Sequence, residues 1–119
     1  DYHPEARKFL QRNTLLNEDK MIAFERVNWV DKNENLGLFD LIIGSDLLYE
    51  DAHVELLSNF IERQSKPSCE VILVDPGRGR KTKLSSRMVE FGFTASHHKP
   101  SHTDYLDKEF KGHILKFER

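Results

Sequence analysis

Polar side chains follow the abrupt end of an apolar run in the middle of the sequence. The apolar residues 41–43 lead into Gly44 and then into Ser45, Asp46 and Tyr49. An apolar run without alternating polar residues is typical of a strand that is covered on both faces, as in a parallel sheet between helices. The loop after such a strand opens at the carboxyl edge of the sheet, where open α/β sheets bind ligands. The hydroxyl, carboxylate and phenol of this loop are therefore candidate ligand-binding groups.

A purely structural role for the same side chains stays open. Asp46 and Asp51 could both cap a helix that begins after the loop, because aspartate accepts hydrogen bonds from the first N–H groups of a helix. Tyr49 could pack in the core. The helix itself is predicted from apolar residues at i, i+3 and i+4 spacing on its inner face. These residues are Val54, Leu57, Phe60 and Ile61.

The sequence on either side alternates between predicted helices and strands. An apolar stripe that starts at Pro4 predicts a helix ending near Asn17, because proline suits the first turn of a helix. A strand is predicted over residues 21–27. A second continuous apolar run predicts another buried strand over residues 71–74, after a break at residues 65–68. This alternation is typical of βαβ units and of a parallel sheet.

The pattern changes in the last third of the sequence. A helix with the apolar residues Leu84 and Met88 is predicted to end at Gly92, since glycine is favoured just past a helix. Residues 93–98 and 113–118 have the pattern of two strands with a polar loop and no helical stripe between them. The predicted fold is therefore an α/β fold with a Rossmann-like parallel sheet that ends in an antiparallel hairpin.

The composition indicates a small soluble protein. The 119 residues suffice for one domain, and 38% of them are apolar and 32% charged. No apolar run approaches the roughly 20 residues that would span a bilayer, and neither a signal peptide nor a transit peptide is visible. Cys69 is the single cysteine of the sequence, which excludes an internal disulfide and fits a reducing compartment. We expect a cytoplasmic protein without a membrane partner.

Charge and histidine content limit the expected partners. With a net charge of -2 the sequence has no general attraction for nucleic acid, although it contains a local basic cluster. The cluster consists of Arg78, Arg80, Lys81 and Lys83. Among the six histidines, His97, His98 and His102 lie close together but lack the strict ligand spacing of a metal site. No metal and no nucleic-acid partner are expected.

Three stretches of the sequence, in the right order, resemble parts of the seven-stranded class I S-adenosylmethionine-dependent methyltransferases. Residues 45–49, SDLLY, resemble the D-x-x-Y loop of the group that contains small protein-lysine methyltransferases and nicotinamide N-methyltransferase-like proteins. Residues 1–4, DYHP, resemble the end of that fold's second strand, and residues 27–29, VNW, resemble the loop after its third strand. The three stretches together cover most of the chain.

The resemblance implies a set of residues that bind S-adenosylmethionine. Asp1 corresponds to the acidic residue that accepts hydrogen bonds from both ribose hydroxyls, and Tyr2 lies beside it. Asn28 and Trp29 correspond to the loop beside the adenine, where an indole offers a flat apolar face and an amide can bind the base edge. Ser45 corresponds to a small residue that touches the adenine or methionine part of the cofactor.

The resemblance also implies which residues are catalytic. Asp46 and Tyr49 correspond to the place where the acceptor nitrogen meets the sulfonium, so Asp46 would orient the acceptor amine and Tyr49 would exclude water. The expected reaction is methyl transfer to a nitrogen, and the expected partner is a methyl acceptor, either a protein lysine or a small heterocyclic amine.

In the resembled fold the strand order is 3-2-1-4-5-7-6. The sequence would then supply strands three to seven and only the last residue of strand two. The glycine-rich turn that lets the cofactor approach the backbone of strand one would also be absent. We therefore expect residues 1–119 to be the C-terminal portion of a single methyltransferase domain.

Two other functions stay open. A non-catalytic Rossmann-like module that binds a nucleotide or a partner protein would have a degenerate glycine-rich turn in its upstream segment. A nucleotide-dependent oxidoreductase is disfavoured by the terminal hairpin and by the SDLLY loop, because a dehydrogenase would normally continue with another parallel unit.

The loop after residue 74 carries a weaker signal. Residues 75–78, DPGR, resemble the D-P-P-Y signature of adenine-N6 methyltransferases only superficially. Residues 77–79, GRG, are too short for a phosphate-binding loop and are better interpreted as a turn, from which Arg78 could contact a substrate.

Overall fold

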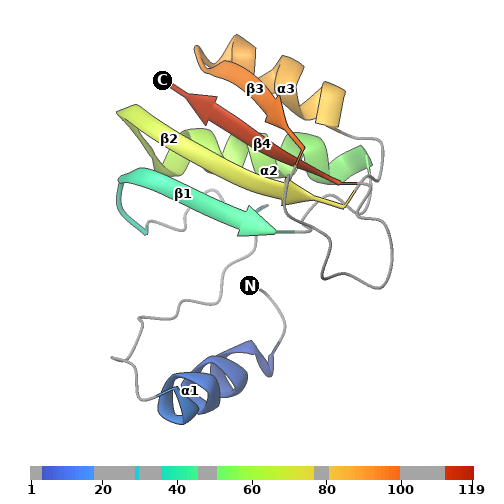
Figure 1. Ribbon diagram of the computed structural model, residues 1–119. Helices are drawn as coiled ribbons and strands as arrows, with labels where there is room; N and C mark the ends of the chain where they lie inside the picture. The colour runs from blue at the N-terminus through green and yellow to red at the C-terminus, as the bar shows by residue number, and fades with distance from the viewer. Residues whose placement is uncertain (1–3, 18–28, 30–35, 46–50, 77–80, 100–111) are drawn as a thin grey trace. The chain divides into compact units, whose positions relative to one another are not determined.

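The computed structural model describes residues 4–17, 29, 36–45, 51–76, 81–99 and 112–119. The chain divides into two compact units, Asp1–Glu34 and Asn35–Arg119. The first unit contains helix α1 (Ala6–Leu16), which confirms the helix predicted between Pro4 and Asn17 (Figure 1). The strand predicted over residues 21–27 lies outside the described residues.

The second unit is built on a sheet of four strands in the order β1-β2-β4-β3 (Figure 1). The strands are β1 (Phe39–Ser45), β2 (Ser65–Asp75), β3 (Thr94–His98) and β4 (His113–Glu118). β1 and β2 run parallel, whereas β4 pairs antiparallel with both β2 and β3. This order corresponds to strands 4-5-7-6 of the resembled fold. The predicted parallel sheet with a terminal antiparallel hairpin is therefore confirmed.

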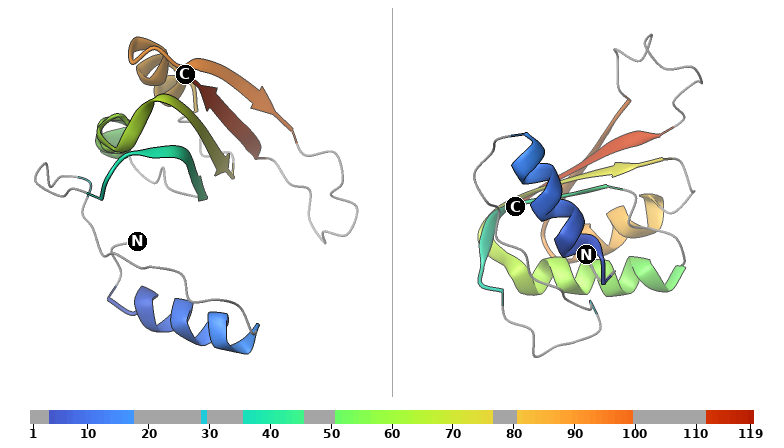
Figure 2. Two further views of the ribbon diagram at one scale, coloured as in Figure 1. Left: turned by 90° about the vertical axis from the view of Figure 1, so that its left-hand side faces the viewer. Right: turned by 90° about the horizontal axis from the view of Figure 1, so that it is seen from below.

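Two helices cover one face of this sheet. Helix α2 (Asp51–Gln64) connects β1 to β2, helix α3 (Lys81–Glu90) connects β2 to β3, and both lie on the same side (Figure 2). The predicted inner positions Val54, Leu57 and Ile61 are buried. Phe60 is half-buried. The core between helices and sheet consists of Val54, Leu57, Ile61, Cys69, Val71, Leu73, Leu84, Met88, Phe93, Leu115 and Phe117.

The prediction that residues 41–43 are covered on both faces is wrong. Leu41 and Ile43 are 53% and 73% exposed, and only Ile42, on the helix side, is half-buried. β1 lies at one edge of the described sheet, and both helices of this unit pack against the opposite face. An unbroken apolar run indicates that both faces of a strand are apolar. The described part of the chain covers only one face of β1.

The helix ends before residues 65–68, as predicted, but these residues belong to β2, which therefore begins earlier than the strand predicted over residues 71–74. Phe39 is paired with Ser65 and Leu41 with Glu70, so the register shifts between these two pairs. A proline lacks the N–H that a regular ladder needs, and an irregular stretch accommodates it. The sequence signal of Pro67 therefore marks a bulged strand end.

The end of α3 matches its prediction. Gly92 has a φ of 92°, a left-handed conformation that favours glycine, and its N–H donates to the backbone oxygen of Val89. The chain then turns Phe93 into the core, where its side chain is 3% exposed. This turn directs β3 back along the sheet beside β4.

Candidate functional site at the carboxyl ends of the parallel strands

The two parallel strands end side by side and bring polar residues to one edge of the sheet. Ser45, the last residue of β1, is paired with Val74, and Asp75 follows as the last residue of β2. The next helices, α2 and α3, begin at Asp51 and Lys81, so their N-terminal ends follow the loops at this same edge. This edge is where parallel α/β sheets bind ligands.

Ser45 is the predicted site residue that the structure places at this edge. Its side chain is exposed, and the preceding Gly44 is half-buried and has no side chain. A small exposed hydroxyl after a glycine leaves room for a ligand to approach the backbone and offers it a hydrogen bond. The local geometry therefore fits the cofactor contact implied for Ser45.

Asp75 is a polar residue of this edge whose environment the sequence did not indicate. Its side chain is only 3% exposed, and its partner in the ladder with β4 is His113. Residues directly opposite in an antiparallel pair lie on one face and interact. The signal in the sequence is an acid directly after the apolar run 71–74, at the predicted carboxyl end of a strand. The departure of residues 77 and 78 from the D-P-P-Y signature weakens this signal.

At the same end of the sheet, a hydrogen bond joins helix α3 to the end of β3. Ser85 Oγ and His97 Nε2 are 2.8 Å apart. Partial burial lowers the pKa of His97 from 6.5, and the positive charges of Lys81, His113 and His98 lower it further. The neutral imidazole is therefore the favoured form at this position.

A shallow groove of about 500 Å³ lies between the first turns of α2 and helix α3. Asp51 and Lys83 form an ion pair of 3.5 Å, and Arg87 Nη2 donates to Asn59 Oδ1 at 3.0 Å. The lining residues are Asp51, Val54, Glu55, Thr82, Lys83, Ser86 and Arg87. None of them is a predicted site residue, so we do not assign the groove to the candidate site.

Trp29 is the other predicted site residue that the structure describes. It is half-buried and belongs to the first unit, which is described by itself. The remaining positions lie outside the described residues. They are Asp1, Tyr2, Asn28, Asp46 and Tyr49.

In the described part of the chain, no group of three or more His, Cys, Asp and Glu side chains could hold a metal ion. No described helix is long and apolar enough to cross a membrane.

Comparison with solved structures identifies the architecture of this chain as a methyltransferase fold. Precorrin-6y C5,15-methyltransferase from Geobacter metallireducens GS-15 superposes with a TM-score of 0.71 at 14% identity, covering 100% of this chain and 65% of that one. The N-methyltransferase NodS from Bradyrhizobium japonicum WM9 superposes with a TM-score of 0.68 at 13% identity, covering 99% and 70%. The chain thus spans about two thirds of the length of these structures.

A second NodS structure, in complex with S-adenosyl-l-homocysteine, superposes with a TM-score of 0.64 at 13% identity, covering 99% of this chain and 63% of that one. No curated protein shows a significant sequence match. The sequence does match the lysine methyltransferase family over residues 1–89. This match contains all three stretches on which the resemblance was based. The chain belongs to the lysine methyltransferase family of class I S-adenosylmethionine-dependent methyltransferases.

Proposed function

We propose that the protein carrying this chain transfers the methyl group of S-adenosylmethionine to a nitrogen atom of a protein side chain or of a small amine. The observation that carries the proposal is the family match over residues 1–89. Every residue that we assign to the site lies within this range. The fold supports the assignment, because the whole chain superposes on a methyltransferase structure with a TM-score of 0.71.

The family resemblance implies which residues would hold the cofactor. Asp1 would accept hydrogen bonds from the ribose hydroxyls, and Tyr2 would lie beside it. Asn28 and Trp29 would bind the adenine, and the half-buried indole of Trp29 keeps part of its apolar surface accessible for such a contact. Ser45 would contact the cofactor from the end of β1.

When bound, S-adenosylmethionine supplies a methyl carbon that its sulfonium already activates. The protein therefore has to place the acceptor lone pair on the axis of the bond that breaks, and positioning supplies most of the catalytic effect. Asp46 would orient the acceptor amine, and Tyr49 would exclude water from the reacting atoms. The amine must lose its proton before it attacks, because only the neutral form has a free lone pair.

The proposal is tested by calorimetry on the full-length protein. S-adenosylmethionine and S-adenosylhomocysteine should each bind with measurable heat and raise the melting temperature. A screen of lysine-bearing proteins and small heterocyclic amines with labelled cofactor should then give labelled product. If neither ligand gives heat or a thermal shift, the proposal fails. Binding of both without any labelled product would favour a non-catalytic module.

A further inference from the structure

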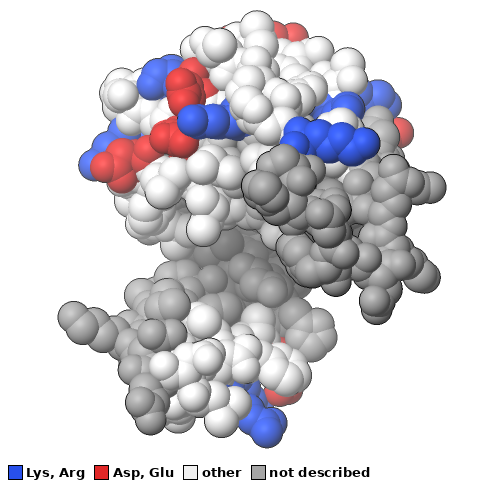
Figure 3. Space-filling model, in the orientation of Figure 1, with Lys and Arg blue, Asp and Glu red and all other residues white. Residues whose placement is uncertain are grey.

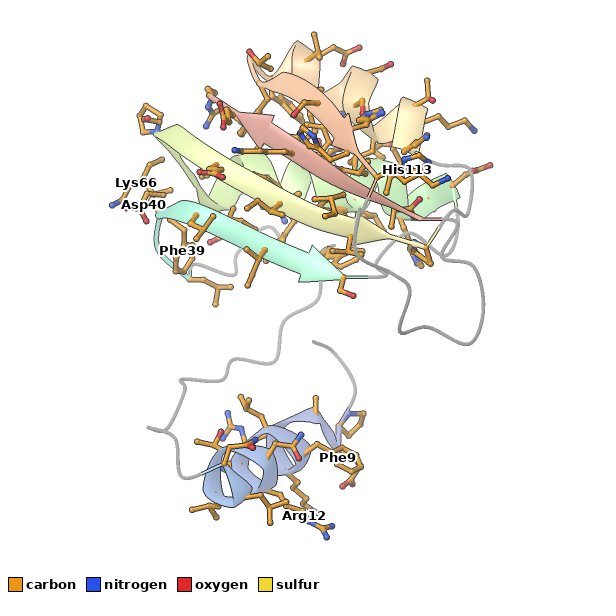
Figure 4. All side chains as sticks on the ribbon, viewed as in Figure 1. Phe9, Arg12, Phe39, Asp40, Lys66 and His113 are labelled. Atoms are coloured by element: carbon orange, nitrogen blue, oxygen red, sulfur yellow. The ribbon has the colours of Figure 1, made fainter. Side chains whose placement is uncertain are left out.

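Basic side chains gather where α3 begins and where β3 ends. His97 and His98 are the last residues of β3, Lys99 follows them and is exposed, and His113 is the first residue of β4. These residues lie at the same end of the sheet as Ser45 and Asp75, because β4 starts opposite the end of β2. Figure 4 shows His113 at this end and Lys66 at the opposite one.

Helix α3 adds a lysine to this group. The 2.8 Å hydrogen bond between Ser85 and His97 holds α3 against the end of β3. Lys81 lies four residues before Ser85, and residues at i and i+4 share a helix face, so Lys81 also faces β3. The charge of Lys81 accordingly acts on His97. We call Lys81, His97, His98, Lys99 and His113 the basic rim.

The carboxylates that the structure describes at this end of the fold do not neutralise the exposed part of the rim. Asp51 forms an ion pair of 3.5 Å with Lys83, which lies outside the rim. Asp75 faces His113 across the β2-β4 ladder, but its side chain is only 3% exposed. Among the described residues, the charged groups that act on His97 are Lys81, His113 and His98.

The opposite end of the sheet has paired charges. Lys116 lies 3.0 Å from Glu118 and 3.5 Å from Glu70, and Lys66 lies 4.0 Å from Asp40. On the face shown in Figure 3, blue and red atoms adjoin at the left, whereas blue atoms predominate at the right, beside the atoms drawn in grey. Among the described residues, the positive surface is therefore local to the edge that carries the candidate site.

We propose that the basic rim docks an acidic segment of the methyl acceptor, so that the acceptor is a protein or peptide with Asp and Glu near its target lysine. This inference rests on the proposed function. β1 and β3 are three strand spacings apart, which is about 14 Å. An extended peptide of about five residues spans this distance, whereas a small heterocyclic amine does not. A positive surface beside the reacting atoms therefore selects an extended, negatively charged acceptor.

A nucleic acid is the less suitable occupant of this surface. Three of the five rim residues are histidines, which are largely neutral near pH 7. Binding of a phosphate backbone requires several permanently charged lysines and arginines along a stripe. A short acidic peptide needs only a few positive charges, and the rim supplies them through Lys81 and Lys99.

The test is peptide binding to the full-length protein, measured by fluorescence anisotropy. One labelled peptide of roughly ten residues carries a central lysine flanked by Asp and Glu, and the matched peptide carries Asn and Gln instead. The acidic peptide should bind about tenfold more tightly, and added salt should weaken its binding.

The variant Lys81→Gln/Lys99→Gln should weaken binding of the acidic peptide about three- to tenfold, as expected for two exposed charges. The control Lys66→Gln removes a positive charge at the far end of β2 and should leave binding unchanged.

The docking proposal is overturned if the acidic and the neutral peptide bind with equal affinity. It is also overturned if Lys66→Gln weakens binding of the acidic peptide as much as Lys81→Gln/Lys99→Gln does. Tighter binding of a duplex RNA oligonucleotide than of the acidic peptide overturns it as well. Calorimetry with S-adenosylmethionine on the same samples separates the two proposals. Cofactor binding without a preference for the acidic peptide refutes the docking surface alone. A preference for the acidic peptide without binding of S-adenosylmethionine refutes the proposed methyl transfer. The rim would then remain a surface that binds acidic peptides.

Discussion

The guanidinium of Arg119 donates a hydrogen bond from Nη1 to Oε2 of Glu62, and so joins the chain after β4 to helix α2. The same group donates to the backbone oxygens of Lys66, Pro67 and Phe91. Its Cζ lies 4.5 Å from the ring centroid of Phe93. One side chain thus connects α2, the start of β2 and the turn after α3.

Replacing Arg119 with lysine should destabilise the protein by about 1–3 kcal/mol, because an ammonium cannot reproduce a planar fork that bonds several acceptors at once. Chemical denaturation of the full-length protein measures this difference. Arg12→Lys on the exposed side of α1 is the matched control and should change stability by less than about 0.5 kcal/mol (Figure 4). Equal effects of the two substitutions would show that the Arg119 contacts are not stabilising.

The stability of the fold should depend on the protonation of His97. Its pKa is lowered in the folded protein by burial and then by Lys81, His113 and His98. Among the described acidic residues of this end, Asp75 on β2 is paired with His113 in the ladder, and Asp51 at the start of α2 forms an ion pair with Lys83. The unfolded chain therefore takes up the proton first as the pH falls, so stability is retained above pH 6.5 and is lost as the pH falls through the lowered pKa.

Melting temperatures of the wild type and of His97→Gln between pH 5 and 8 test this sign, because glutamine keeps a hydrogen-bonding group toward Ser85 and does not titrate in this range. The wild type should lose more stability on acidification than the variant. A histidine titration by NMR that places the midpoint of His97 at or above 6.5 would contradict the expected direction.

The second unit was largely predictable because its elements depend on local patterns. Val54, Leu57 and Ile61 have helical spacing, Gly92 marks a helix end, and residues 113–118 form the predicted strand. The strand order could be predicted only through the family resemblance, since periodicity identifies strands and leaves their neighbours undetermined.

The errors concern properties that depend on neighbours. The exposure of Leu41 and Ile43 depends on what lies against β1, and the apolar run itself has no information about this. Pro67 correctly indicated that a helix ends before it. That Pro67 itself belongs to β2 depends on the irregular pairing of this strand with Phe39 of β1. The burial of Asp75 depends on β4, which follows it by almost forty residues.

The exposed side of β1 predicts how the 119-residue chain behaves by itself. Leu41 and Ile43 form an apolar surface on a strand at the edge of the described sheet, and such edges favour association. We expect concentration-dependent association, measured by light scattering after size exclusion, and less of it in Ile43→Lys. Val89→Lys changes a residue of 55% exposure on α3 and serves as the control. A monomer with a cooperative two-state transition would contradict this prediction.

Trp29 should contribute to cofactor affinity more than to turnover. If its indole binds the adenine, Trp29→Ala should weaken S-adenosylmethionine binding by about 1–3 kcal/mol, the order expected for loss of an aromatic contact with a base. Trp29→Phe keeps an aromatic face and should lose less. Calorimetry measures both affinities, and the turnover at saturating cofactor should stay close to that of the wild type. Unchanged affinity in Trp29→Ala would remove this residue from the site.

Asp46 should show the opposite behaviour. If its carboxylate orients the acceptor amine, Asp46→Ala removes an interaction that matters when the nitrogen is aligned for attack. Turnover should fall by roughly a hundredfold, as expected when a reacting group loses its position, while cofactor affinity changes little. Kinetics with an acceptor from the labelled-cofactor screen measure the first quantity, and calorimetry measures the second.

The alternative role of this loop makes a different prediction. If Asp46 caps α2 and Tyr49 packs in the core, then Asp46→Ala should lower the melting temperature and leave turnover normal, since a lost cap costs about 0.5–2 kcal/mol of stability. Tyr49→Phe and Tyr49→Ala would then destabilise the fold in proportion to the volume removed.

Asp46→Asn discriminates further, because asparagine caps a helix almost as well as aspartate but has no charge with which to attract a protonated amine. A variant with normal stability and low turnover assigns the carboxylate to the reaction, whereas normal turnover in Asp46→Asn and Asp46→Ala would end the catalytic assignment.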